Sequence, residues 1–122
     1  MTDQTFCVDT VAGMFPINAD HINDWLILND WLTARDGSLL PMDHVIEKYW
    51  MVERIDTGET LPCAAFTYAG LCQFLSVPII RHLFQYCCQR LRLGKSVDCV
   101  EAQKILSSCK IKVLQHEHRV VQ

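Results

Sequence analysis

Glycine is scarce in this chain and never clustered. The five glycines stand alone, at positions 13, 37, 58, 70 and 94. Phosphate-binding loops and dinucleotide fingerprints need several glycines within one tight turn, so the sequence excludes both. It also contains neither a G-x-S-x-G nucleophile elbow nor an H-E-x-x-H metal pair. With no recognised catalytic motif, we expect a protein that is not an enzyme and that needs no cofactor.

Long apolar runs are also missing. No stretch approaches the roughly 20 residues that cross a bilayer. The first residues, Met1-Thr2-Asp3-Gln4, are polar and acidic, unlike the basic start and apolar core of an export signal. Half of the 122 residues are nevertheless hydrophobic, which suffices for a core. We expect one compact cytoplasmic domain over 1–122, without a membrane partner.

Seven cysteines are present, but no C-x2-C pair that would indicate structural zinc. In a reducing cytoplasm we expect most of them to be small buried hydrophobic residues. His116 and His118 could share one face of a strand, but no third ligand is evident, so no metal site is predicted. A cysteine with a histidine partner could meet only in the fold, and Asp43, His44 and Glu47 are equally well explained as solvated surface.

Positive charge is scarce in the first part of the chain. Residues 1–75 hold eleven acidic and three basic side chains, whereas residues 76–122 hold three acidic and eight basic ones. The two parts could attract each other within the monomer or across a head-to-tail homodimer. Alternatively, the basic part binds a polyanion and the acidic part binds a basic partner.

Apolar spacing predicts a mainly helical (α+β) fold. Asn18 is a good N-cap for an amphipathic helix over about 19–35, with Gly37 as its stop. Pro41 opens a second helix that includes Tyr49 and Trp50 on its apolar side. A short strand at 6–8 and a hairpin of 51–55 with 60–62 complete the first part.

Helices also dominate the second part. Thr67 can cap a helix that runs to position 75, and Ser76 can cap the next one, from Pro78 to Gly94. Asp98 and Glu101 have capping-box spacing for a helix that ends near 107. Alternation predicts strands at 110–114 and 119–121. The predicted architecture is a compact bundle of about four to five helices with a small hairpin or minor sheet.

The segment 67–92 has the layout of a helix-turn-helix, with 76–78 as the turn. Arginine reads guanine and glutamine reads adenine in the major groove, while further basic residues hold phosphates. The leading hypothesis is therefore a small regulator that binds duplex DNA. Its predicted DNA-binding residues are Arg81, Gln85, Gln89, Arg90, Arg92, Lys95 and Lys104. His82 stands where such motifs normally bury an aliphatic residue, and two plain core helices would give the same pattern.

The alternative hypothesis is an adaptor or inhibitor that binds a basic partner protein, a class that includes nucleic-acid-binding proteins. Its predicted interface is a set of carboxylates on or between the first two helices: Asp20, Asp24, Asp30, Asp36, Asp43 and Glu47. Aromatic side chains in the same region would serve as anchors if they are exposed. Burial of Trp25, Trp31, Tyr49 and Trp50 therefore decides whether these rings belong to an interface or to the core.

Overall fold

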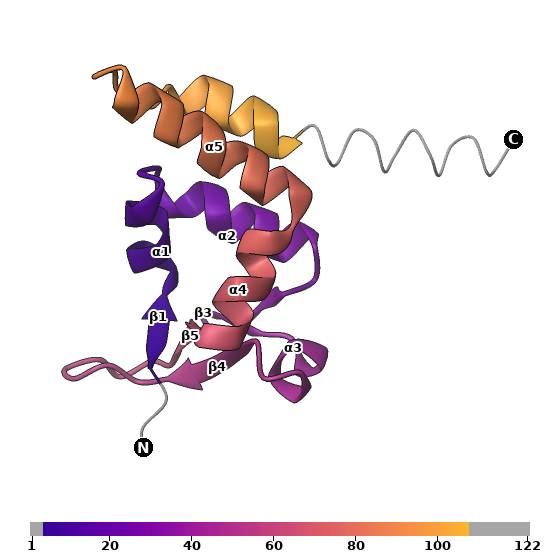
Figure 1. Cartoon of the computed structure of the whole chain (residues 1–122). Coiled ribbons are helices and arrows are strands. Elements are labelled where there is room, and N and C mark those ends of the chain that lie inside the picture. The colour runs from indigo at the N-terminus through magenta and orange to yellow at the C-terminus, as the bar shows by residue number, and fades with distance from the viewer. Residues whose placement is uncertain (1–3, 108–122) are drawn as a thin grey trace, which may run out of the picture.

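A computed structural model describes residues 4–107 of the chain (Figure 1). The described residues are helical again over 99–107, after the last labelled helix. In chain order, the labelled elements are β1 (Thr5–Cys7), α1 (Val8–Met14), α2 (Ala19–Leu28), β2 (Leu32–Arg35), β3 (Ser38–Pro41), α3 (Asp43–Glu47), β4 (Met51–Arg54), β5 (Cys63–Thr67), α4 (Tyr68–Ser76) and α5 (Pro78–Arg92).

The strands form two antiparallel sheets. One sheet has the order β1-β5-β4, with Cys7 paired to Ala65 and Val52 paired to the same residue from the other side. The other is the β2–β3 hairpin, in which Leu32 pairs with Pro41. Five strands in two sheets make this an α+β fold, so the predicted helical bundle with a minor sheet is wrong.

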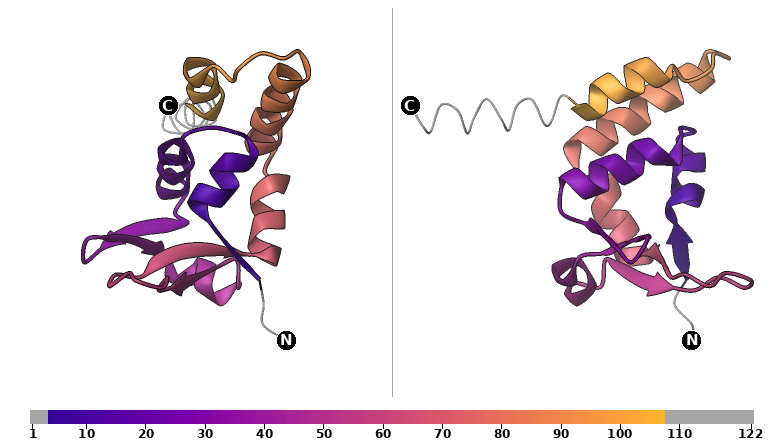
Figure 2. Two further views of the ribbon diagram at one scale, coloured as in Figure 1. Left: turned by 90° about the vertical axis from the view of Figure 1, so that its left-hand side faces the viewer. Right: turned by 180° about the vertical axis from the view of Figure 1, so that it is seen from behind.

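The elements form two layers that α4 connects (Figures 1 and 2). The strands and α3 lie at one end of the molecule, and α1, α2, α5 and the 99–107 helix lie at the other. α5 and the 99–107 helix run side by side in both figures, farthest from the sheet. None of the helices within residues 4–107 has the length and apolar character needed to span a bilayer.

The predicted helix over 19–35 is wrong beyond residue 28. Asn18 caps α2 as expected, through a side-chain oxygen that accepts from the Asp20 N–H. After Leu28 the chain turns with Asp30 in the left-handed region, at a φ of 61°, and the Trp31 N–H donates back to the Leu26 carbonyl. This is a Schellman ending with aspartate where glycine is usual.

Two left-handed residues then build the β2–β3 hairpin. Asp36 and Gly37 have φ values of 51° and 82° and occupy its two-residue turn. Asp-Gly between two apolar arms is a strong hairpin signal. The sequence did not predict this hairpin, because Trp31 and Leu32 continue the apolar spacing of α2. Both residues are buried in the observed structure, as they would be in the predicted helix.

The predicted second helix is also shorter than expected. Pro41 ends β3 instead of opening a helix, and α3 covers only Asp43–Glu47. Tyr49 has a φ of 58°, and the Trp50 N–H donates to the Val45 carbonyl, so this helix ends in a second Schellman motif. Tyr49 and Trp50 therefore leave the helical stripe predicted for them.

Several local predictions are confirmed. β1 matches the predicted strand within one residue, and the hydroxyl of Thr67 caps α4. Asp98 accepts from the N–H groups of Val100 and Glu101 at the start of the 99–107 helix.

The hairpin predicted after position 50 exists, but its second strand is β5 and not 60–62. Ser76 does not cap α5, because its hydroxyl donates to the Gln73 carbonyl. The predicted strands at 110–114 and 119–121 lie outside the described residues.

A cluster of five aromatic rings joins the layers. Trp31 is its centre: its ring stacks on Trp50, with centroids 5.0 Å apart and planes 23° apart. It also lies 6.1–6.2 Å from the rings of Trp25, Phe66 and Phe74. These rings come from the ends of α2 and α3, from β5 and from α4, so one cluster fixes the relative positions of four segments.

The cysteines are less buried than predicted. Among those in the described range, Cys87 is fully buried, Cys7, Cys63 and Cys88 are half-buried, and Cys72 and Cys99 are exposed; all six are free thiols. Burial, with a smaller contribution from the neighbouring Cys88, raises the pKa of the Cys87 thiol from its usual value near 9 to about 11. Cys87 alone behaves as a core hydrophobic residue in the expected manner.

Thr67 and Gly70 lock the start of α4 to the backbone of Trp50. The Thr67 N–H donates to the Trp50 carbonyl at 3.0 Å, and its hydroxyl donates to the Tyr49 carbonyl at 2.6 Å. A Cβ added at Gly70 would lie 1.6 Å from the Trp50 carbonyl oxygen. Only glycine permits this approach between two backbone segments.

Gly70→Ala should therefore lower the free energy of unfolding by roughly 2–4 kcal/mol, because a backbone atom and not a flexible side chain blocks the new methyl group. Gly13→Ala in α1 is the matched control, since its Cβ would meet nothing within 4 Å. It should leave stability unchanged or raise it by up to about 1 kcal/mol. Urea unfolding of both variants tests this, and equal midpoints for Gly70→Ala and the wild type would contradict it.

Cys87 should make stability fall at alkaline pH. Its pKa is raised in the folded chain, so between about pH 9 and 11 the thiol loses its proton in the unfolded chain but keeps it in the folded chain. This difference lowers the free energy of unfolding as the pH rises. The stability difference between wild type and Cys87→Ala should shrink by on the order of 2 kcal/mol between pH 8 and 10.5. Urea unfolding in reducing buffer measures it. A difference between wild type and Cys87→Ala that stays constant from pH 8 to 10.5 would refute the assignment.

Candidate nucleic-acid interface

α5 is an amphipathic helix with one face in the core. Pro78 occupies its first turn, where a missing N–H is harmless, and Ile80, Leu83 and Cys87 are buried. The Phe84 ring packs edge-on against Phe15 at the end of α1, with centroids 5.2 Å apart. These contacts fix which face of α5 points outward.

The outward face carries four of the predicted DNA-binding residues. Arg81, Gln85 and Gln89 recur every four residues, and Arg92 follows three residues later. Each four-residue step turns a helix by only about 40°, so these side chains form one stripe. All four are exposed. We call Arg81, Gln85, Gln89 and Arg92 the α5 stripe.

The charge of the α5 stripe is not neutralised within the described chain. Residues 78–92 contain no acidic side chain. The two ion pairs found among residues 4–107 are Arg35–Glu53, at 2.8 Å, and Arg54–Asp56, at 2.7 Å, and both lie in the acidic part. The predicted attraction between the two parts of the monomer therefore has no ion pair in this range, and Arg81 and Arg92 remain available to an anion.

Arg90 does not belong to the α5 stripe. It lies nine residues after Arg81, which places it on the opposite side of the helix. The side chain is half-buried, and its Nε donates to the Ser96 carbonyl at 2.8 Å. Arg90 holds the turn between α5 and the 99–107 helix, so the structure separates it from the residues with which it was predicted to act.

Lys95 and Lys104 lie outside α5. Lys95 follows Gly94, whose φ of 72° ends the helix, and the Lys95 N–H donates to the Arg90 carbonyl. Lys104 lies on the 99–107 helix. Both are exposed.

The predicted three-residue turn 76–78 is shorter in the structure. Val77 alone separates α4 from α5, in an extended conformation that serves as the end of one helix and the start of the next. A standard helix-turn-helix uses three or four residues there. His82 is exposed. It therefore does not occupy the buried position that the motif would give it. The segment keeps two successive helices but not the connection of the standard motif.

The acidic residues of the alternative hypothesis divide between the two layers. Asp20 and Asp24 lie on α2, in the helical layer. Asp36 occupies the β2–β3 turn, and α3 carries Asp43 and Glu47 beside the sheet. Asp30 lies between them, with its carbonyl hydrogen-bonded to the His44 ring. All six side chains are exposed.

The aromatic residues near these carboxylates divide as well. Trp25 and Trp31 are buried and belong to the core. Trp50 is half-buried, with the Lys48 ammonium 4.5 Å from its ring, and Tyr49 is 47% exposed. Two of the four candidate anchors are thus explained by packing alone.

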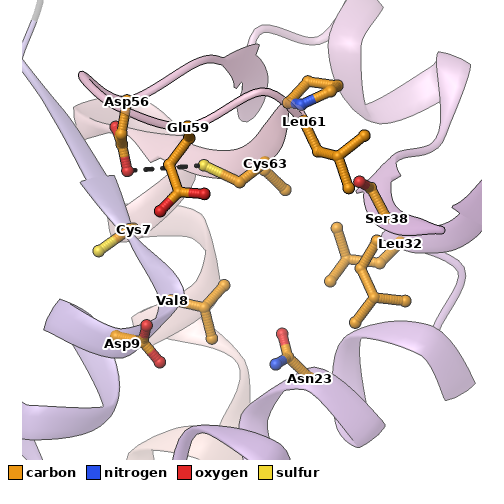
Figure 3. A pocket seen from close by; sticks show the side chains of 13 residues that line it. Cys7, Val8, Asp9, Asn23, Leu32, Ser38, Asp56, Glu59, Leu61 and Cys63 are labelled. Atoms are coloured by element: carbon orange, nitrogen blue, oxygen red, sulfur yellow. Dashed lines mark hydrogen bonds between the residues drawn. The ribbon is translucent and has the colours of Figure 1, made fainter.

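A separate cleft of about 430 Å³ lies between β1, the β2–β3 hairpin and the loop before β5 (Figure 3). Cys7 and Cys63 line it together with Asp9, Asp56 and Glu59. In Figure 3 the Cys63 sulfur points toward Asp56, with a 4.0 Å contact to its Oδ2. No histidine is among the lining residues.

The cleft does not make the Cys63 thiol more reactive. Burial, and then the charge of Asp56, raises the pKa of Cys63, and Arg54 opposes the shift only in part. A raised pKa keeps the thiol protonated and weakly nucleophilic near neutral pH. Nowhere in residues 4–107 do three or more His, Cys, Asp or Glu side chains gather as metal ligands would. His116 and His118 lie outside this range.

A comparison of the chain with family models, curated proteins and solved structures yields no match.

Proposed function

We propose that this protein is a small non-enzymatic regulator that binds duplex DNA through the outward face of α5. The observation that carries the proposal is the α5 stripe, which presents two arginines and two glutamines on one exposed side of a helix without carboxylates. Arginine and glutamine are the side chains that bind guanine and adenine edges in the major groove.

The dimensions of α5 support this proposal. Fifteen residues make a helix about 22 Å long, which suits a major groove about 12 Å wide. α5 also lies in the outermost part of the helical layer, where a duplex could approach it (Figure 2). Lys95 and Lys104 would then contact phosphates at the groove edge.

The proposal differs from the sequence-based hypothesis in one residue. Arg90 lies on the opposite side of α5 and is tied to Ser96, so it acts in the fold and not in the groove. We place the protein in the cytoplasm, where free thiols such as those of Cys72 and Cys99 persist.

Replacing both Arg81 and Arg92 with alanine should weaken binding to a mixed-sequence duplex at least about tenfold at low salt. It should also reduce the slope of log affinity against log salt, by about one for each guanidinium that neutralises a phosphate. Fluorescence polarisation with a labelled duplex of about 30 base pairs measures both quantities.

Two arginine variants provide matched controls. Arg35→Ala removes an arginine that is already paired with Glu53, and Arg90→Ala removes the one on the far side of α5. Both should bind within about twofold of the wild type, since neither guanidinium belongs to the stripe. The proposal fails if the wild type does not bind at low salt, or if either control loses as much affinity as the double variant.

A further inference from the structure

A second hollow lies between α2 and the 99–107 helix, apart from the α5 stripe. Its volume is about 300 Å³. α2 contributes Asp24, Ile27 and Leu28, and the facing helix contributes Gln103 and Leu106. The His21 ring hydrogen-bonds to the Gln103 side chain and thereby links the two walls. We call this hollow the α2 groove.

Two apolar residues of the α2 groove, Ile27 and Leu28, lie outside the core that residues 4–107 form. α2 already buries Ile22, Trp25 and Leu26 on its inner side. Ile27 and Leu28 stand on its outer side, 41% and 56% exposed. A helix that is apolar on both sides usually packs against two neighbours, and the described residues supply α2 with only one filled side here.

Carboxylates border this apolar surface. Asp20 and Asp24 are four residues apart, so they share the edge of α2 that continues to Leu28. Neither carboxylate forms an ion pair within residues 4–107. The facing helix carries one acidic and one basic residue, Glu101 and Lys104, whose charges cancel. The carboxylates of α2 therefore give the groove its negative charge.

We propose that the α2 groove binds an amphipathic basic helix of a partner protein. Apolar residues at helical spacing would cover Ile27 and Leu28, and Lys or Arg side chains of the same helix would reach Asp20 and Asp24. The α5 stripe has the same charge as this ligand and repels it. The proposal does not rest on DNA binding, and one activity can fail without the other.

The probe is a labelled 18-residue peptide with leucine at helical i, i+3, i+4 and i+7 positions and lysine elsewhere. A second peptide replaces every lysine with glutamate. Fluorescence polarisation with the full-length chain should show saturable binding of the basic peptide only. Leu28→Glu and Asp24→Lys should each weaken that binding at least about tenfold.

Each variant has a control with the same chemical change elsewhere. Leu61→Glu alters a leucine of similar exposure, 52%, in the loop before β5, and Glu47→Lys reverses a charge on α3. Both should bind the basic peptide within about twofold of the wild type. Circular dichroism and urea unfolding establish that all four variants are folded, which the exposure of the replaced side chains favours.

Four results would overturn the proposal. They are no binding of the basic peptide, equal binding of the acidic peptide, and equal losses in groove and control variants. The fourth is a self-associating wild type whose dimer Leu28→Glu dissociates, because a second copy of the chain would then occupy the groove. Sedimentation of the unlabelled chain distinguishes that last case.

Discussion

The packing of the Trp31 ring against Trp25, Trp50, Phe66 and Phe74 holds the two layers of this protein together. Trp31 and Trp50 are each the residue that follows a left-handed turn at the end of a helix. The same turns that stop α2 and α3 therefore deliver both indoles to the junction. From this junction β5 continues directly into α4, and α4 leads to α5, so the orientation of the α5 stripe depends on the cluster.

The local signals that the sequence conveyed correctly are those that act within a few residues. Side chains such as Asn18, Thr67 and Asp98 cap helices by accepting from N–H groups two or three residues later, and each is found at its cap. The stripe of α5 follows from helical spacing in the same way. Function at that stripe remains a proposal, because spacing reveals which residues share a face and not what binds them.

The failures have a common physical cause. Trp31 and Leu32 continue the helical spacing of α2, and both are also buried in the observed turn and strand, so burial at these positions could not distinguish a helix from the structure found. Left-handed backbone occurs at only a few per cent of non-glycine residues, so the residue types of Asp30 and Tyr49 did not predict these helix ends. Arg90 is different. Its nine-residue separation from Arg81 already placed the two on opposite sides of the helix, so the sequence contained that answer.

The pairing of β1 with β5 also has a consequence for the order in which the chain folds. Cys7 pairs with Ala65, whereas β2 with β3 and β4 with β5 are neighbours along the chain. The two hairpins close short loops and can form early, but β1 must wait for a partner almost sixty residues away. During synthesis, the first strand therefore leaves the ribosome long before β5 exists. β1 can join β5 only after the β4–β5 hairpin has formed, so the three-stranded sheet is completed late in assembly.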